Sequence, residues 1–150
     1  MGIQVKAGDL LQAAEHVIGH QVNCQGVMGS GVAKSIRAQF PEAYEAYLEL
    51  CSRTSNEELL GRCQMVQTPD GKHVANLFGQ FNYGRQPKLY TDYDALRQAL
   101  SQLKGYARER GLTVALPYQI GCGLANGDWS IVEAMINEIF EDYEVTLYRL

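Results

Sequence analysis

Apolar and polar residues follow two different periods along the first part of the chain. Residues 3–7 alternate as in a strand, and the mostly apolar stretch 16–23 predicts a second strand. Apolar residues then recur at helical spacing in 32–40 and again after Pro41, and proline is favoured in a first helical turn. The expected apolar stripe of this second helix is Ala43, Tyr44, Tyr47, Leu48 and Cys51. Two strands and two helices are therefore predicted.

A hairpin and a long helix are predicted in the middle of the chain. Segments 61–68 and 73–79 have the pattern of strands, and a Pro-Asp-Gly turn sequence joins them. Thr91 and Asp94 fit a capping box at the start of a helix that ends at Gly111. The apolar stripe of this helix comprises Leu96, Leu100, Leu103 and Ala107.

The last part of the chain repeats the order of strand, glycine turn and helix. Residues 112–116 predict a strand, 121–127 a glycine-rich turn and 144–150 a final strand. Asp128 and Ser130 both suit the cap of the intervening helix, whose apolar residues are Ile131, Met135, Ile136 and Ile139. Such alternation predicts an α/β fold, with helices on both faces of the sheet and ligands where strand ends meet glycine loops.

Composition and charge exclude several classes of protein. The 150 residues are 46% hydrophobic and fit one domain over 1–150, expected to be a monomer. Thirteen Lys plus Arg against seventeen Asp plus Glu give a charge of −4, which argues against binding a nucleic-acid backbone or an anionic membrane. No apolar run approaches the roughly 20 residues that span a bilayer, and 1–6 lacks the apolar core of a secretory signal. We expect a cytoplasmic protein.

The four cysteines do not predict a metal site. They form no Cys-x-x-Cys pair, and no histidine lies at zinc-ligand spacing from them. Cys122 is either a nucleophile or a small buried residue, and the absence of a nearby base in the sequence favours the second interpretation. No carboxylate cluster suggests Mg²⁺, so neither a metal nor a cofactor is expected.

Two glycine-rich loops are candidate anion-binding sites. The loop 23–32 joins a strand to a helix, where free backbone N–H groups can bind phosphate. It is not a P-loop, which requires lysine at Val32, and the dinucleotide motif read from Gly29 fails at Lys34. A tight turn without a ligand is the alternative. The loop 120–124 has the same setting, so the two loops could bind a diphosphate between them.

Three polar side chains have two interpretations each. Asp9 follows a strand and could either bind a base or ribose or cap a helix that begins near Leu10. His20 lies three residues before Asn23 in an apolar stretch, as a core residue or a site residue. Tyr148 could stack on a base or pack as an ordinary aromatic side chain. The residues alone leave these alternatives open.

Three stretches, taken in order, resemble a macrodomain: Gly8-Asp9-Leu10, 22–33 and 116–124. The resemblance covers essentially the whole chain. It is strongest to the branch that includes ADP-ribose 1''-phosphate phosphatases and the terminal ADP-ribose glycohydrolase, and 40–51 is particularly similar to the phosphatases. The resemblance implies a three-layer αβα fold with a mixed, mostly parallel sheet and a cleft for ADP-ribose.

The resemblance also implies roles for individual residues. Asp9 would hold the adenine amino group, assisted by the backbone of Leu10, and Tyr148 would pack on the adenine. Asn23 would orient the distal ribose, and His20 matches a histidine that is important in the phosphatase branch, where it could position or protonate a phosphate oxygen. The first loop would wrap the distal ribose and one phosphate and the second would close over the diphosphate, through Gly29, Ser30, Gly31 and Val32, and Gly121, Cys122, Gly123 and Leu124.

Two departures from the family pattern bear on activity. Ala125 stands where the glycohydrolase branch has an acid, and 77–81 contains no lysine where that branch places its covalent lysine. We expect hydrolysis at the distal ribose of an ADP-ribose derivative, first of the 1''-phosphate. Deacylation of O-acetyl-ADP-ribose and de-ADP-ribosylation by water are alternatives. A reader that binds ADP-ribose or an ADP-ribosylated substrate without turnover is the competing class.

Overall fold

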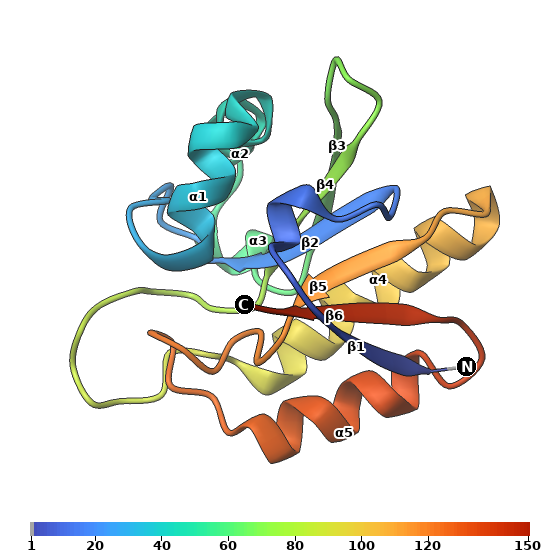
Figure 1. Cartoon of the computed structure of the whole chain (residues 1–150). Helices are drawn as coiled ribbons and strands as arrows, with labels where there is room; N and C mark the ends of the chain where they lie inside the picture. The colour runs from blue at the N-terminus through green and yellow to red at the C-terminus, as the bar shows by residue number, and fades with distance from the viewer. Residues whose placement is uncertain (1) are drawn as a thin grey trace.

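A six-stranded sheet forms the centre of the computed structural model, which describes residues 2–150 (Figure 1). The strand order is β1-β6-β5-β2-β4-β3, and among the strand pairs of the described residues only β3–β4 is antiparallel. The expected mixed, mostly parallel sheet and the hairpin are thus confirmed. The strands are β1 (Ile3–Ala7), β2 (Val17–Val22), β3 (Cys63–Gln67), β4 (His73–Phe78), β5 (Val114–Pro117) and β6 (Val145–Arg149).

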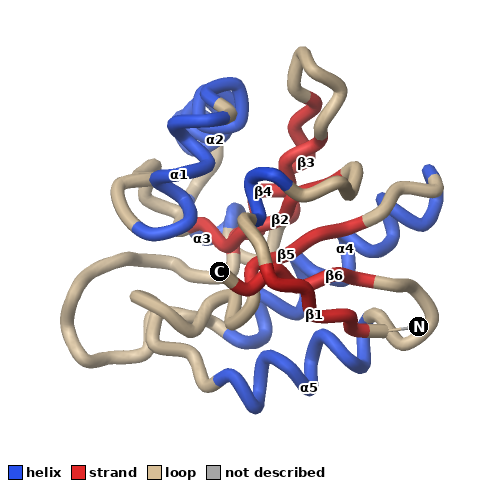
Figure 2. Tube along the Cα trace, in the orientation of Figure 1, coloured by secondary structure: helices blue, strands red, loops and turns tan. Residues whose placement is uncertain are grey.

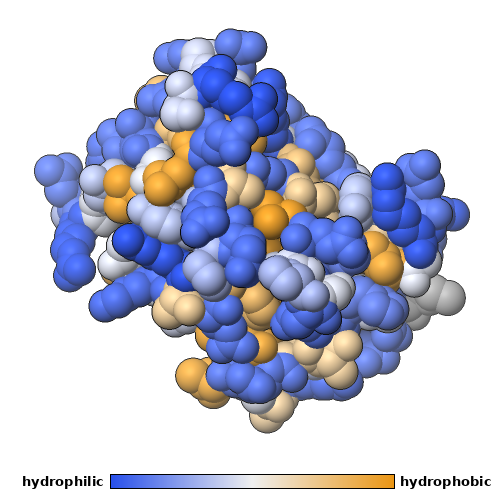
Figure 3. Space-filling view, turned by 90° about the horizontal axis from the view of Figure 1, so that it is seen from above, coloured by the Kyte–Doolittle hydropathy of each residue, from blue (hydrophilic) through white to orange (hydrophobic). Residues whose placement is uncertain are grey.

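Helices cover both faces of the sheet and complete three layers (Figures 1 and 2). Side chains alternate along β2, so Val17 packs in the cluster formed with α4 and α5 while Ile18 packs with Ile36 of α1. On the face shown in Figure 3, hydrophobic residues are scattered between hydrophilic ones, since the apolar stripes point inward. The helices are α1 (Gly31–Gln39), α2 (Pro41–Arg53), α3 (Asn56–Leu59), α4 (Tyr93–Arg110) and α5 (Trp129–Ile139), with a 3₁₀ turn, η1, at Leu10–Gln12.

Several local predictions need correction. The cap of α4 is Asp92, whose carboxylate accepts a hydrogen bond from the N–H of Ala95, so the box of Thr91 and Asp94 was wrong. The hydroxyl of Thr91 is engaged elsewhere, as described below. Leu48 and Ile131 were placed on apolar stripes but are 37% and 43% exposed, because each lies at the edge of its helix's buried face.

The sheet opens between its two central strands. β5 pairs with β2 only at Val17–Val114 and Ile18–Ala115. Beyond these pairs β2 remains paired with β4 on one side, and β5 remains paired with β6 on the other. Such a switch point leaves a crevice beyond the carboxyl ends of the strands.

Candidate ligand-binding cleft

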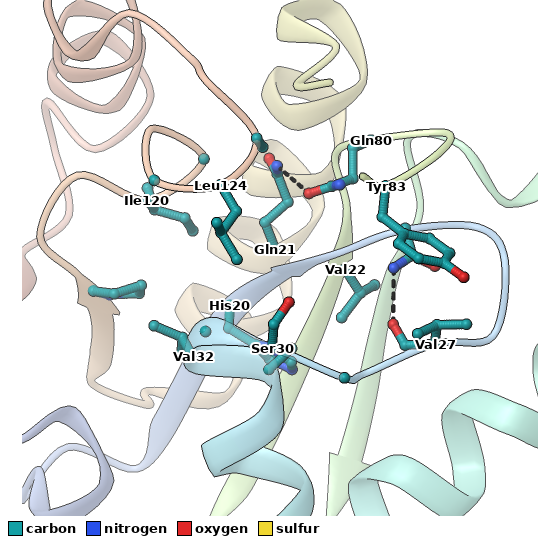
Figure 4. A pocket seen from close by; sticks show the side chains of 18 of the residues that line it. His20, Gln21, Val22, Val27, Ser30, Val32, Gln80, Tyr83, Ile120 and Leu124 are labelled. Carbon is teal, nitrogen blue, oxygen red and sulfur yellow. Dashed lines mark hydrogen bonds between the residues drawn. The ribbon is translucent and has the colours of Figure 1, made fainter. Parts of the chain in front are cut away.

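The crevice contains two adjoining cavities. The first, of about 500 Å³, lies between the two glycine loops (Figure 4), and the second, of about 670 Å³, lies beside η1 and the end of β6. Gly31, Val32 and Pro117 line both cavities. The two cavities therefore form one elongated cleft at the place where α/β folds bind ligands.

Asn23 shapes the first glycine loop from within. Its Oδ1 accepts a hydrogen bond from the N–H of Gln25 at 2.8 Å, and its Nδ2 donates to the carbonyl of Val27 at 2.8 Å. The hydroxyl of Tyr47 lies 2.7 Å from the backbone carbonyl oxygen of Asn23 and 2.9 Å from Oδ1. Tyr47 also accepts from the N–H of Gly26 and Val27, both at 3.1 Å. Asn23 therefore holds the loop in shape, and it also lines the first cavity, where its predicted role is to orient the distal ribose.

The first loop presents unpaired donors to the cleft. Within residues 2–150, the backbone N–H groups of 29–33 make no hydrogen bond, and the side chain of Ser30, the N-cap residue of α1, does not cap the helix. The predicted residues of this loop all line the first cavity, namely Gly29, Ser30, Gly31 and Val32. A helix N-terminus with free donors is suited to an anion.

The second loop presents a similar run of donors. In the described chain, the N–H groups of 123–125 have no acceptor. Of the residues predicted to close over the diphosphate, Gly121, Gly123 and Leu124 line the first cavity, together with Ala125. Cys122 is not among the lining residues, since its N–H bonds to the carbonyl of Gln119 and its Sγ contacts that of Ile120.

His20 lies at the first cavity (Figure 4). Burial lowers the pKa of its imidazole to about 4. Nε2 lies 2.7 Å from Oδ1 of Asn76, whose Nδ2 donates to Gln64 and to the carbonyl of Ala43. The amide of Asn76 is thus oriented so that Nε2 of His20 carries the hydrogen. Nδ1 is then a buried acceptor that has no partner in the described part of the chain.

The predicted adenine residues meet at the second cavity, which is lined by Asp9, Leu10 and Tyr148. Asp9 Oδ1 accepts from the N–H of Leu11 at 3.0 Å, so its capping role is confirmed. Its other carboxylate oxygen accepts no hydrogen bond within residues 2–150 and is therefore available to a ligand. The hydroxyl of Tyr148 donates to Glu15 at 2.6 Å, which fixes the ring at the cavity wall.

Two glutamines at the first cavity had no predicted role. Gln21 and Gln80 line the cavity and hydrogen-bond to each other, with 2.8 Å between Nε2 of Gln21 and Oε1 of Gln80 (Figure 4). Gln80 lies in the segment in which lysine was sought. The signal that could have identified Gln21 is a long polar side chain in the middle of an apolar strand.

Neither a metal centre nor a membrane helix occurs among residues 2–150. No group of three or more His, Cys, Asp or Glu side chains there could hold a metal ion. No helix in that range has the length and apolar character needed to cross a bilayer.

The fold and cleft define an α/β protein with an elongated cleft at the switch point of its sheet, bordered by backbone donors that suit an anionic ligand. The family model of the Macro domain matches residues 20–136, and the chain belongs to this family. The resemblance expected from the sequence and the three-layer fold are both confirmed.

Three known proteins show how far the similarity extends. A Mycobacterium tuberculosis protein named DNA ADP-ribosyl glycohydrolase is 34% identical over 95% of this chain, which spans 40% of the relative's length. ADP-ribose 1''-phosphate phosphatase of Meyerozyma guilliermondii is 26% identical over 87% of this chain and 90% of its own. A Bacteroides thetaiotaomicron protein of unknown function has a solved structure with a TM-score of 0.89, 30% identity and coverage of 100% and 99%.

Proposed function

We propose that this protein binds ADP-ribose in the cleft. The observation that carries the proposal is that two segments with unpaired backbone N–H groups, 29–33 and 123–125, border the first cavity. This cavity adjoins the second one, which Asp9 lines. Backbone donors can neutralise a diphosphate without a metal, and Asp9 has a carboxylate oxygen free for an adenine amino group. Glycine loops in a protein of net charge −4 favour such a small anionic group over a nucleic-acid backbone.

We further propose hydrolysis at the distal ribose, with ADP-ribose 1''-phosphate as the first substrate. The name of the Meyerozyma relative and the position of His20 at the first cavity support this assignment. Within residues 2–150 Nδ1 of His20 has no partner, and in a neutral imidazole this atom is an acceptor. We therefore propose that His20 positions the distal group by accepting a hydrogen bond from it. Deacylation of O-acetyl-ADP-ribose would use the same position.

A second candidate is removal of ADP-ribose from a nucleic acid. The mycobacterial relative's name points to it, and so does the segment 81–89 beside the first cavity. This segment exposes Phe81 and Tyr83, carries Arg85 and Lys88 and contains no acid. Aromatic faces and cations together suit the bases and phosphates of a modified strand.

Calorimetric titration with ADP-ribose tests the binding proposal. We expect one-to-one binding that weakens at least tenfold in Asp9→Ala, because the variant removes the adenine acceptor. AMP serves as the comparison ligand, since it contains the same base. No heat and no thermal stabilisation by ADP-ribose would refute the proposal.

Turnover is tested with a panel of the 1''-phosphate, O-acetyl-ADP-ribose, and an ADP-ribosylated oligonucleotide and peptide. His20→Asn should retain ADP-ribose binding but lose at least 90% of phosphate release. Equal turnover by this variant would remove His20 from the reaction. Binding without turnover of any substrate would identify a reader.

A further inference from the structure

Thr91 hydrogen-bonds to the second loop on both sides of its unpaired N–H groups, 123–125, without lining the cavity itself. The side chain is 3% exposed, and Oγ1 donates to the carbonyl of Gly121 at 2.6 Å. The N–H of Thr91 donates to the carbonyl of Ala125 at 3.2 Å, and the N–H of Tyr90 reaches the same oxygen at 2.9 Å. The carbonyls of Gly121 and Ala125 flank the unpaired donors of 123–125, so one residue holds both flanks.

A chain of amides fixes the direction of the Thr91 hydroxyl. Gln80 donates through Nε2 to the carbonyl of Asn82 at 2.8 Å, so its Oε1 faces Gln21 as an acceptor. Gln21 must then present Nε2, which also donates to Oγ1 of Thr91 at 3.0 Å. Because Thr91 accepts that bond, its only hydroxyl hydrogen is left for the carbonyl of Gly121.

Three glycines make room for this network. A Cβ at Gly79 would stand 2.3 Å from Oε1 of Gln21, and one at Gly127 would stand 2.5 Å from the carbonyl oxygen of Gly121. Gly121 itself has φ +77°, and its Cβ would approach Thr91 to 3.2 Å. The glycines of this region are therefore required by contacts inside the wall, apart from any ligand.

We propose that Thr91 is a positioning residue, whose hydroxyl holds the N–H groups of 123–125 in the arrangement that receives the diphosphate. Gln21 and Gln80 act through Thr91 by setting the direction of its hydroxyl. Thr91 lines neither cavity, so its effect on a ligand would be exerted through the second loop. As regards the identity of the ligand, this inference rests on the proposed binding of ADP-ribose.

Paired substitutions at Thr91 test the inference. Thr91→Val keeps the shape of the side chain and removes the hydroxyl, so we expect the Kd for ADP-ribose to rise roughly tenfold. Thr91→Ser restores the hydroxyl and should bind within about twofold of the unchanged protein. AMP lacks the second phosphate and the distal ribose, so Thr91→Val should weaken its binding less than that of ADP-ribose.

Thr68 provides the matched control for loss of a buried hydroxyl. It is 4% exposed, and its hydroxyl contacts both the carboxylate of Asp70 and the carbonyl of Lys72, in the β3–β4 hairpin outside both cavities. Thr68→Val should lower the unfolding midpoint and leave the Kd unchanged. A general effect of stability on binding would instead weaken both valine variants, and that result would overturn the positioning role.

Amide NMR of the free protein separates this inference from the proposed function. In Thr91→Val we expect shifted or broadened signals from 123–125, with recovery in Thr91→Ser. If the unchanged protein fails to bind ADP-ribose, the proposed function is refuted. The amide signals of 123–125 still show in that case whether Thr91 holds the loop. Unchanged signals in Thr91→Val, or unchanged affinity in a protein that binds, would overturn the inference.

Discussion

Protonation of His20, a residue of the cleft, is expected to lower the stability of the folded protein. Its pKa is about 4 in the folded protein, because burial disfavours the imidazolium, against an ordinary value of 6.5. Between these values the unfolded chain binds a proton that the folded protein does not. Stability from this residue is therefore fully present above pH 6.5 and is lost as the pH falls towards 4, by about 3 kcal/mol in total.

Urea unfolding at a series of pH values measures this contribution. His20→Asn, which has no titratable group, should show a shallower loss of unfolding free energy between pH 6.5 and 4 than the unchanged protein. The difference between the two curves isolates His20 from all other titrating groups. Parallel curves would mean that the imidazole is accessible to protons in the folded state.

At the scale of an element, α4 offers two glycines with opposite expectations. Gly105 lies within the helix and Gly111 at its C-cap with φ +67°, and a Cβ at either would meet nothing within 4 Å. Gly105→Ala should stabilise the protein by roughly 0.5–1 kcal/mol, because alanine loses less backbone freedom on folding. Gly111→Ala should cost about 1–2 kcal/mol, because the left-handed conformation disfavours a side chain.

Thermal or urea unfolding of the two variants checks this opposition. Neither position lines the cleft, so ADP-ribose binding serves as an internal control and should not change. A stabilised Gly111→Ala would indicate that the end of α4 relaxes out of the left-handed conformation.

The helices and strands were predictable because each depends on neighbouring residues. The period of Leu96, Leu100 and Leu103 marks α4 without any knowledge of its partners. Thr91 was misassigned for the complementary reason. Its hydroxyl could have capped the helix locally, but Asp92 does so, and the partner of Thr91 lies thirty residues further along the chain at Gly121.

For the molecule as a whole, the sequence placed both glycine loops but not the network that joins them. The predicted positions in these loops line the cleft, apart from Cys122, and Asp9, Leu10 and Tyr148 meet at its second cavity. The network itself depends on pairing between segments that are far apart in the sequence. Gln21 reaches the second loop only because β2 lies beside both β4 and β5, an order that local patterns do not encode.

The four thiols, spread over the whole molecule, are predicted to be unreactive in the folded state. Burial raises the pKa of Cys24 and Cys63 to about 12 and that of Cys122 to about 11, and it raises the pKa of Cys51 as well. At pH 8, iodoacetamide should therefore modify the folded protein on the order of 100-fold more slowly than the urea-unfolded chain, as mass spectrometry would show. Cys122→Ser should retain ADP-ribose binding, since neither cavity is lined by this residue. Rapid modification of Cys122 in the folded protein, with loss of binding or turnover, would instead restore its interpretation as a nucleophile.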